Sequence, residues 1–114
     1  MFTGQLWLDY DVDGFEGRYQ ANVTRALIRG DEIAIEFSGT DPDDGPFSGS
    51  CHLEKKGAFF TGSGHFSVRK DSQSASVVVA LKREDGCVSL TGSWQDSGDS
   101  EAYDFTVELE EAKV

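Results

Sequence analysis

The run Asp9-Tyr10-Asp11-Val12-Asp13-Gly14 comes closer to a metal-binding motif than any other pattern in this sequence. It matches the start of a calcium loop, in which alternate carboxylates coordinate the ion. That motif requires a bidentate Glu at its twelfth position, where this chain has Gln20. The flanking residues also predict strands, whereas the motif lies between helices. Two interpretations stay open: a calcium candidate formed by Asp9, Asp11 and Asp13, or an acidic hairpin turn, which the pattern favours.

His52 and His65 are the two histidines of the chain, and the pattern places both on the polar face of neighbouring strands. A metal pair there would need a third ligand, and none is evident. The sequence contains no nucleophile elbow and no phosphate-binding loop. Its many carboxylates fall mainly in turns, where nothing indicates a raised pKa. We therefore predict no catalytic residues, no metal centre and no cofactor, and we expect a protein that is not an enzyme.

Charge narrows the classes of partner. The 114 residues carry 21 acidic and 10 basic side chains, which gives a net charge of -11. Nucleic-acid binding needs a basic face, and so does attachment to an anionic membrane. We expect neither. The acidity fits solubility, a saline habitat, or a face that docks on a basic protein, and charge alone does not separate these readings.

The sequence predicts a cytoplasmic protein with reduced thiols. No apolar run reaches the roughly 18 residues of a membrane helix. The start of the sequence lacks a basic segment followed by an apolar stretch, so we expect no signal peptide. Without export, Cys51 and Cys87 should be reduced. Both fall on apolar-rich strands, where a thiol behaves as a small hydrophobic group.

Alternation of apolar and polar residues with a period of two runs along nearly the whole chain. It predicts about eight strands, at residues 2–10, 17–24, 32–39, 47–54, 60–68, 75–83, 88–95 and 103–110. Residues 21–29 have weak helical spacing, but their β-branched content favours a strand. Turn pairs such as Asp13-Gly14 and Asp85-Gly86 separate the strands, so successive strands should pair as antiparallel hairpins.

The chain length fits a single domain spanning residues 1–114, with a tail at 110–114 that could be disordered. Closing eight antiparallel strands into an up-and-down barrel removes the exposed edges of the sheet, and a β-sandwich is the alternative. Alternation also predicts a buried face. Its members are Leu6, Ile35, Phe37, Phe60, Val79, Leu90, Phe105 and Val107.

A short motif of an apolar residue, Ser or Thr, and Gly recurs on several strands. The copies are Phe2-Thr3-Gly4, Phe37-Ser38-Gly39, Phe47-Ser48-Gly49, Phe60-Thr61-Gly62 and Leu90-Thr91-Gly92. The glycine shares a face with the apolar residue, where it allows the sheet to bend sharply, as a small barrel requires. The Ser and Thr residues form a polar stripe on the other face. That stripe is either the solvated outside of the barrel or, near one mouth, the lining of a polar pocket.

The segment 87–100, which begins Cys-Val-Ser-Leu-Thr-Gly-Ser-Trp and continues into a Gly-Ser loop, resembles the first strand and loop of the avidin family. Phe60-Thr61-Gly62 is similar to a later motif of that family. Avidins are eight-stranded up-and-down barrels of the calycin group, so the resemblance implies this fold. Avidins line their biotin pocket with several tryptophans, whereas this chain has only Trp7 and Trp94. We therefore expect the fold without biotin binding.

Strand alternation brings the loop Asp41–Pro46 to the same mouth as the turns at Lys70-Asp71 and Ser97-Gly98-Asp99. We predict that this acidic mouth binds a ligand or partner. The predicted binding residues are Phe47, Trp94, Tyr103, Asp43, Asp44, Asp96 and Asp99. Acidic loops above aromatic side chains suit a small cationic amphipathic molecule or a basic protein loop. Two functions stay open: a small-molecule-binding barrel, or an acidic interaction module, such as an inhibitor or immunity-type protein, with a filled barrel.

Overall fold

A computed structural model describes residues 2–12, 15–42, 45–98 and 101–111 of the chain. These residues form eight strands and no helix. The strands are β1 (Phe2–Val12), β2 (Phe15–Arg29), β3 (Glu32–Asp41), β4 (Gly45–Lys56), β5 (Phe59–Val68), β6 (Asp71–Glu84), β7 (Cys87–Asp96) and β8 (Tyr103–Glu111). Because the described part contains no helix, it contains none long and apolar enough to cross a membrane.

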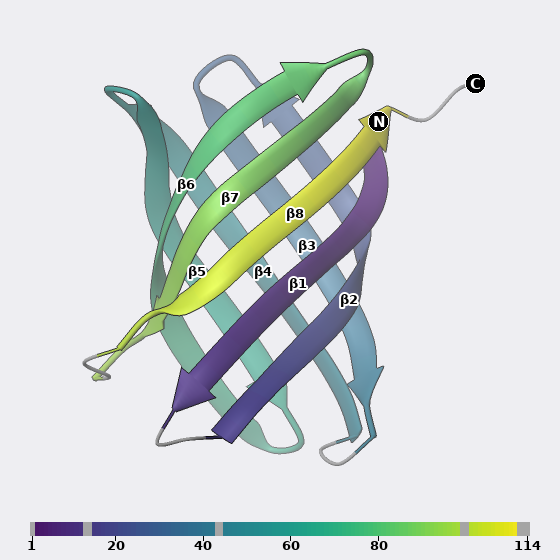
Figure 1. The fold of residues 1–114 in the computed structure, drawn as a ribbon, viewed down its shortest axis with the longest axis vertical. Helices are drawn as coiled ribbons and strands as arrows, with labels where there is room; N and C mark the ends of the chain where they lie inside the picture. Colours follow the sequence, from purple (N-terminus) through teal and green to yellow (C-terminus); the bar gives the residue numbers. More distant parts are fainter. Residues whose placement is uncertain (1, 13–14, 43–44, 99–100, 112–114) are drawn as a thin grey trace.

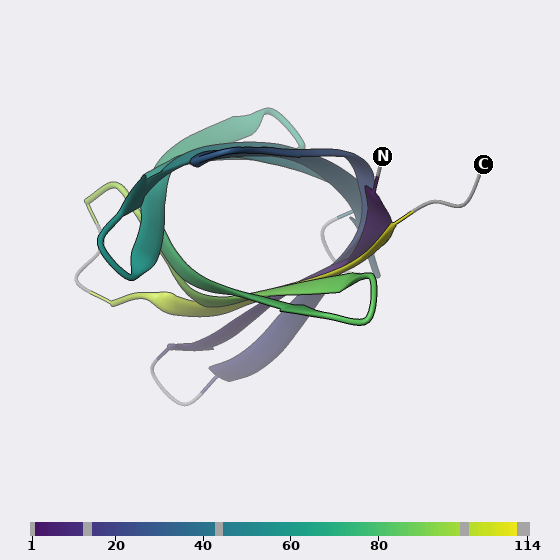
Figure 2. The same ribbon diagram turned by 90° about the horizontal axis from the view of Figure 1, so that it is seen from above.

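The strands form a closed barrel in which each pairs with its neighbours in sequence (Figures 1 and 2). Antiparallel pairing of β1 with β8, from Phe2 opposite Glu111 to Asp9 opposite Asp104, completes the ring. The up-and-down barrel is therefore confirmed over the β-sandwich. The odd-numbered strands end and the even-numbered strands begin at the same end of the barrel, the lower end in Figure 1. We call it the pocket end.

All eight strands extend beyond their predicted boundaries, and in β2 and β8 the extension changes how residues were assigned. Strand β2 continues to Arg29 through an irregularity in its pairing with β3, where the register shifts between Val23 and Arg25. Thr24 and Arg25 are consequently both exposed, and inward alternation resumes at Ala26. Strand β8 continues through Glu111, so residues 110 and 111 belong to the strand rather than to the predicted tail. Residues 112–114 lie outside the described residues.

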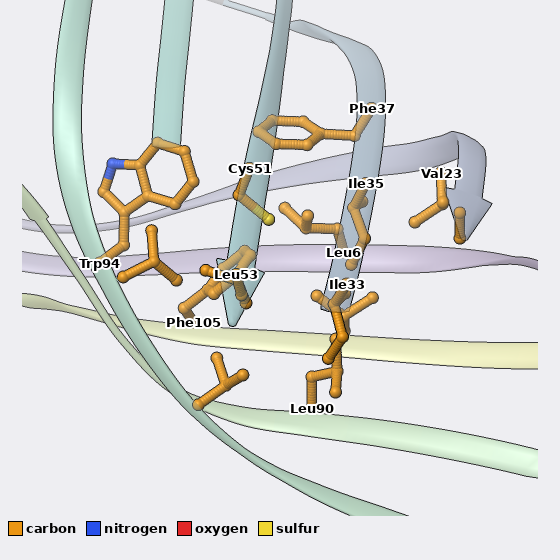
Figure 3. Close-up of a cluster of buried hydrophobic side chains, with 14 of the residues drawn as sticks. Leu6, Val23, Ile33, Ile35, Phe37, Cys51, Leu53, Leu90, Trp94 and Phe105 are labelled. Carbon is orange, nitrogen blue, oxygen red and sulfur yellow. The ribbon is translucent and has the colours of Figure 1, made fainter. Parts of the chain in front are cut away.

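The barrel interior is filled with apolar side chains, and all eight residues predicted to be buried are buried. Figure 3 shows aromatic and aliphatic members of this core, which come from strands around the whole ring. No polar or charged residue is buried among those that the structure describes. The polar stripe of Ser and Thr residues lies on the outer wall, where its members are exposed or partly exposed.

The glycines of the repeated motif lie where strands or rings approach too closely for a side chain. A β-carbon on Gly4, Gly62 or Gly92 would overlap the backbone of the adjacent strand. Gly39 and Gly49 also approach neighbouring backbone, and in addition they lie under the rings of Phe47 and Phe37. The motif is thus a packing device of the closed sheet, as its position on the apolar face predicts.

The two cysteines have different environments, and both are free thiols. Cys51 projects into the core beside Phe37 (Figure 3), and burial raises the pKa of its thiol to about 12. Cys87 is exposed at the start of β7, so the expectation that it acts as a small hydrophobic group is wrong. Alternation places Val88 inside, and this places its neighbour Cys87 outside.

Candidate binding pocket at one end of the barrel

A pocket of about 290 Å³ opens at this end of the barrel, next to the filled core. We call it the mouth pocket. Its volume lies near the lower limit of about 300–1,000 Å³ that is usual for small-molecule sites. It is lined by Leu8, Tyr19, Phe66, Val68, Gln73, Trp94, Asp96 and Tyr103.

Strand alternation explains why these side chains meet. Four lining residues share a strand face with a buried core residue two positions away, namely Tyr19, Gln73, Asp96 and Tyr103, and Leu8 and Trp94 are themselves buried. Tyr19 precedes Ala21 in this way, and Gln73 precedes Ala75. Asp96 likewise follows Trp94 by two positions. The pocket is therefore the last inward-facing layer of the barrel, where the core ends and polar side chains first point inward.

A network of aromatic rings forms the floor and one wall of the mouth pocket. The centroids of Tyr19 and Phe66 are 5.3 Å apart, and Phe47 stacks on Phe66 with centroids 5.4 Å apart. Trp94 contacts Phe37 and Phe105 edge-on, at 6.1 and 5.3 Å. Such contacts fix the rings because each is wedged between others in preferred geometries. The pocket wall is consequently preformed.

One hydrogen bond holds the acidic group of the pocket. The indole Nε1 of the fully buried Trp94 donates to Oδ1 of Asp96 at 3.0 Å. This contact satisfies the polar atom of a buried tryptophan, as such residues require. It also positions a carboxylate at the wall of an otherwise mainly apolar pocket.

The structure brings together three of the predicted binding residues, since Trp94, Asp96 and Tyr103 all line the mouth pocket. Phe47 does not line the pocket but packs against two residues that do, Tyr19 and Phe66. The other predicted binding residues, Asp43, Asp44 and Asp99, lie outside the described residues.

Sequence reasoning missed the other members of the mouth pocket: Leu8, Tyr19, Phe66, Val68 and Gln73. A signal for the pocket was present in the alternation pattern. Gln73 and Asp96 are polar residues at inward-facing positions of their strands, close to the turns. Polar side chains on the apolar face near a strand end are typical of a barrel mouth that accepts a ligand.

Acidic side chains outnumber basic ones around this end. Asp41, Asp71 and Glu101 lie at the ends of the strands or in the connections there, with Arg69 and Lys70 in the β5–β6 turn. The β3–β4 and β7–β8 connections also contain three of the predicted acidic residues, which lie outside the described part. Among the described residues, the mouth pocket thus opens beside more acidic than basic side chains.

The calcium candidate is described only in part. Asp9 lies opposite Arg18 in the pairing of β1 with β2, and both of its carboxylate oxygens accept from the guanidinium, at 2.5 and 3.3 Å. This contact raises the pKa of the exposed Arg18, chiefly through the hydrogen bond and then through the charge of Asp9. Among the described residues, no group of three or more potential ligands is arranged to hold a metal. The side chains of Asp11 and Asp13 lie outside the description.

Both histidines lie on the outer wall, as predicted, and line a groove of about 520 Å³ that crosses β2 to β6. They are not directly opposed, because His52 pairs with Ser63 and His65 with Ser50. The Nε2 of His65 lies 3.1 Å from the hydroxyl of Ser72. The groove is separated from the mouth pocket by the wall of the barrel.

No protein-family model matches this chain, and a comparison with curated proteins finds no match. A comparison with solved structures finds a de novo designed fluorescence-activating β-barrel, with a TM-score of 0.56 and 16% sequence identity. The match covers 97% of this chain and 91% of the designed one. This likeness supports the closed barrel and, at that identity, shows the fold alone.

Proposed function

We propose that this protein acts by binding rather than by catalysis, and that a small amphipathic molecule enters the mouth pocket. The observation that carries the proposal is a concave site of about 290 Å³ in which aromatic rings converge with a few polar groups. Elsewhere the interior is filled, so the described residues leave little space for a ligand deeper in the barrel. The pocket is preformed, which lowers the cost of ordering on binding.

Intrinsic fluorescence offers a direct test. Trp7→Phe leaves Trp94 as the only tryptophan, and it lines the pocket. Adding a neutral naphthylamine dye should change the emission of Trp94 in a saturable manner, with one dye bound per chain. Val68→Phe should fill the pocket and weaken dye binding at least tenfold. Ser67→Phe adds the same ring to an outward-facing position next to it and should leave dye binding unchanged.

Binding of the dye that is equally strong in the Val68→Phe variant would contradict the proposal, provided that the variant remains folded. Circular dichroism in the far ultraviolet checks the fold independently of the dye. Absence of saturable binding of neutral, cationic and anionic dyes to the parent chain would contradict it as well.

A second candidate function, an acidic protein-interaction module, is favoured by the filled core and the small volume of the pocket. In this case the pocket would accept a side chain of a basic loop rather than a free molecule. The test is a variant carrying Asp43→Asn, Asp44→Asn, Asp96→Asn and Asp99→Asn. A protein captured from the native host should bind this variant more weakly and with a flatter salt dependence. Unchanged affinity and salt dependence would exclude the acidic mouth from recognition.

A further inference from the structure

We infer that the mouth pocket selects a methylated ammonium group, such as a quaternary amine, as the charged part of its ligand. This inference rests on the proposed function and adds the chemical class of the ligand. It follows from the kinds of group that line the pocket. Four of them are aromatic and come from four different strands: Tyr19 from β2, Phe66 from β5, Trp94 from β7 and Tyr103 from β8.

The charge of the lining has one sign. Asp96 is its ionisable carboxylate, and no Lys, Arg or His belongs to the lining among the residues that the structure describes. The faces of aromatic rings carry a partial negative charge, which attracts a cation placed over them. The carboxylate and the rings therefore favour a positive charge in the same small volume, and both disfavour an anion.

The chemistry of the rings distinguishes a methylated ammonium from other cations. A primary ammonium carries three donors that each need an acceptor when they leave water. The side-chain acceptors of the lining are confined to Asp96, Gln73 and the two tyrosine hydroxyls, whereas Leu8, Val68 and the ring faces supply none. A quaternary ammonium has no N–H donor and an apolar surface of methyl groups, so it loses little on entering such a site. Aromatic recognition of quaternary and methylated amines is a known use of cation–π attraction.

Asp96 supplies the negative charge in this selection. Its Oδ1 accepts from Trp94, which holds the carboxylate at the pocket wall beside the rings. Asp96→Asn removes the charge while its side-chain oxygen can still accept from the indole, so the variant isolates charge from shape. Asp104→Asn is the matched control, because Asp104 is an exposed carboxylate on the outer face near the pocket end, opposite Asp9 and Ser93.

The experiment compares choline with 3,3-dimethylbutan-1-ol, its neutral carbon isostere, by following the methyl proton shifts of each as protein is added. We expect choline to bind about tenfold more tightly, with its methyl signal shifted upfield by the rings. Asp96→Asn should remove most of this preference and leave the affinity for the neutral alcohol unchanged. Asp104→Asn should retain the preference.

Equal affinities for the two isosteres, or tighter binding of an anionic than of a cationic dye, would overturn the inference. A choline preference that survives in Asp96→Asn would also overturn the role of this carboxylate. In each case the proposed function would stand if the neutral dye still binds and Val68→Phe still blocks it. Failure of every small molecule to bind would overturn the proposed function together with the inference.

Discussion

Phe37 lies directly opposite Gly49 in the pairing of β3 with β4, and its ring covers the glycine so closely that a β-carbon there would overlap it. Two residues along, the relation is reversed, because Phe47 lies opposite Gly39 and its ring occupies the space above that glycine. Two copies of the repeated motif thus pair antiparallel, each supplying the ring that the other accommodates. The same rings lead to the mouth pocket through Phe66 and Trp94.

Replacing Gly92 tests whether the close approach of β7 to β6 requires a glycine. A β-carbon at this position would overlap the backbone carbonyl of Val78 on β6, which cannot move without shifting a strand. We expect Gly92→Ala to lower the free energy of unfolding by about 1–3 kcal/mol, the usual cost of overpacking. Thr91→Ala, at an exposed outward position next to it, should cost less than about 1 kcal/mol. Equal costs in urea unfolding would show that the glycine isn't required by packing.

Burial separates two phenylalanines of the barrel. Phe37 is 2% exposed, whereas Phe59 is 50% exposed on β5. We expect Phe37→Ala to destabilise the protein by about 3–5 kcal/mol, because it removes a buried ring and leaves a cavity. Phe59→Ala should cost under about 1 kcal/mol. Denaturant titrations of both variants measure the difference, and a loss below about 1 kcal/mol for Phe37→Ala would refute the assignment of faces.

Burial also predicts a pH dependence for Cys51. Its pKa in the folded state is about 12, against an ordinary value of 9.0, because burial disfavours the thiolate. The unfolded chain therefore releases this proton first as the pH rises. The stabilising effect of the neutral thiol is complete below about pH 9 and is lost progressively toward pH 12.

Replacing the thiol isolates this effect. Cys51→Ala should have a flatter loss of stability than the parent chain above pH 9, since the alanine has nothing to ionise. The comparison of the two unfolding free energies at pH 8 and pH 11 provides the measurement. Parallel losses in parent and variant would contradict the predicted burial of the thiol.

The two thiols should react at different rates with a thiol reagent at pH 8. Cys87 is exposed and should react as soon as the reagent is added, whereas Cys51 should react only after unfolding. We expect one thiol per chain to react under native conditions and two to react in denaturant. Two rapid equivalents in the native protein would show that the interior admits the reagent, and none would show that the cysteines are not both free.

The Asp9–Arg18 ion pair should contribute little to stability and should depend on salt. Both side chains contact solvent, where water and ions screen the attraction. A double-mutant cycle with Asp9→Asn and Arg18→Gln should give a small favourable coupling at low salt that vanishes near 1 M salt. Coupling that persists at high salt would indicate a buried, unscreened pair instead.

Much of this architecture is encoded locally. Alternation along each strand determines which side chains point inward, so Leu90 and Phe105 could be placed in the core from their neighbours alone. Turn residues set the strand order, and short connections make successive strands antiparallel. From these, the grouping of the β3–β4, β5–β6 and β7–β8 connections at one end also follows.

Only the tertiary structure decides what meets at that end. Tyr19 and Phe66 lie on β2 and β5, and their contact depends on how far the closed sheet curves and staggers. Alternation in β2 breaks after Val23, but only the pairing with β3 shows that the strand continues there through a register shift. Alternation assigns each residue to a face, but closure determines the distance across the barrel. For that reason Trp94 and Asp96 could be placed at this end of the barrel from the sequence, while the rings that share the pocket with them could not.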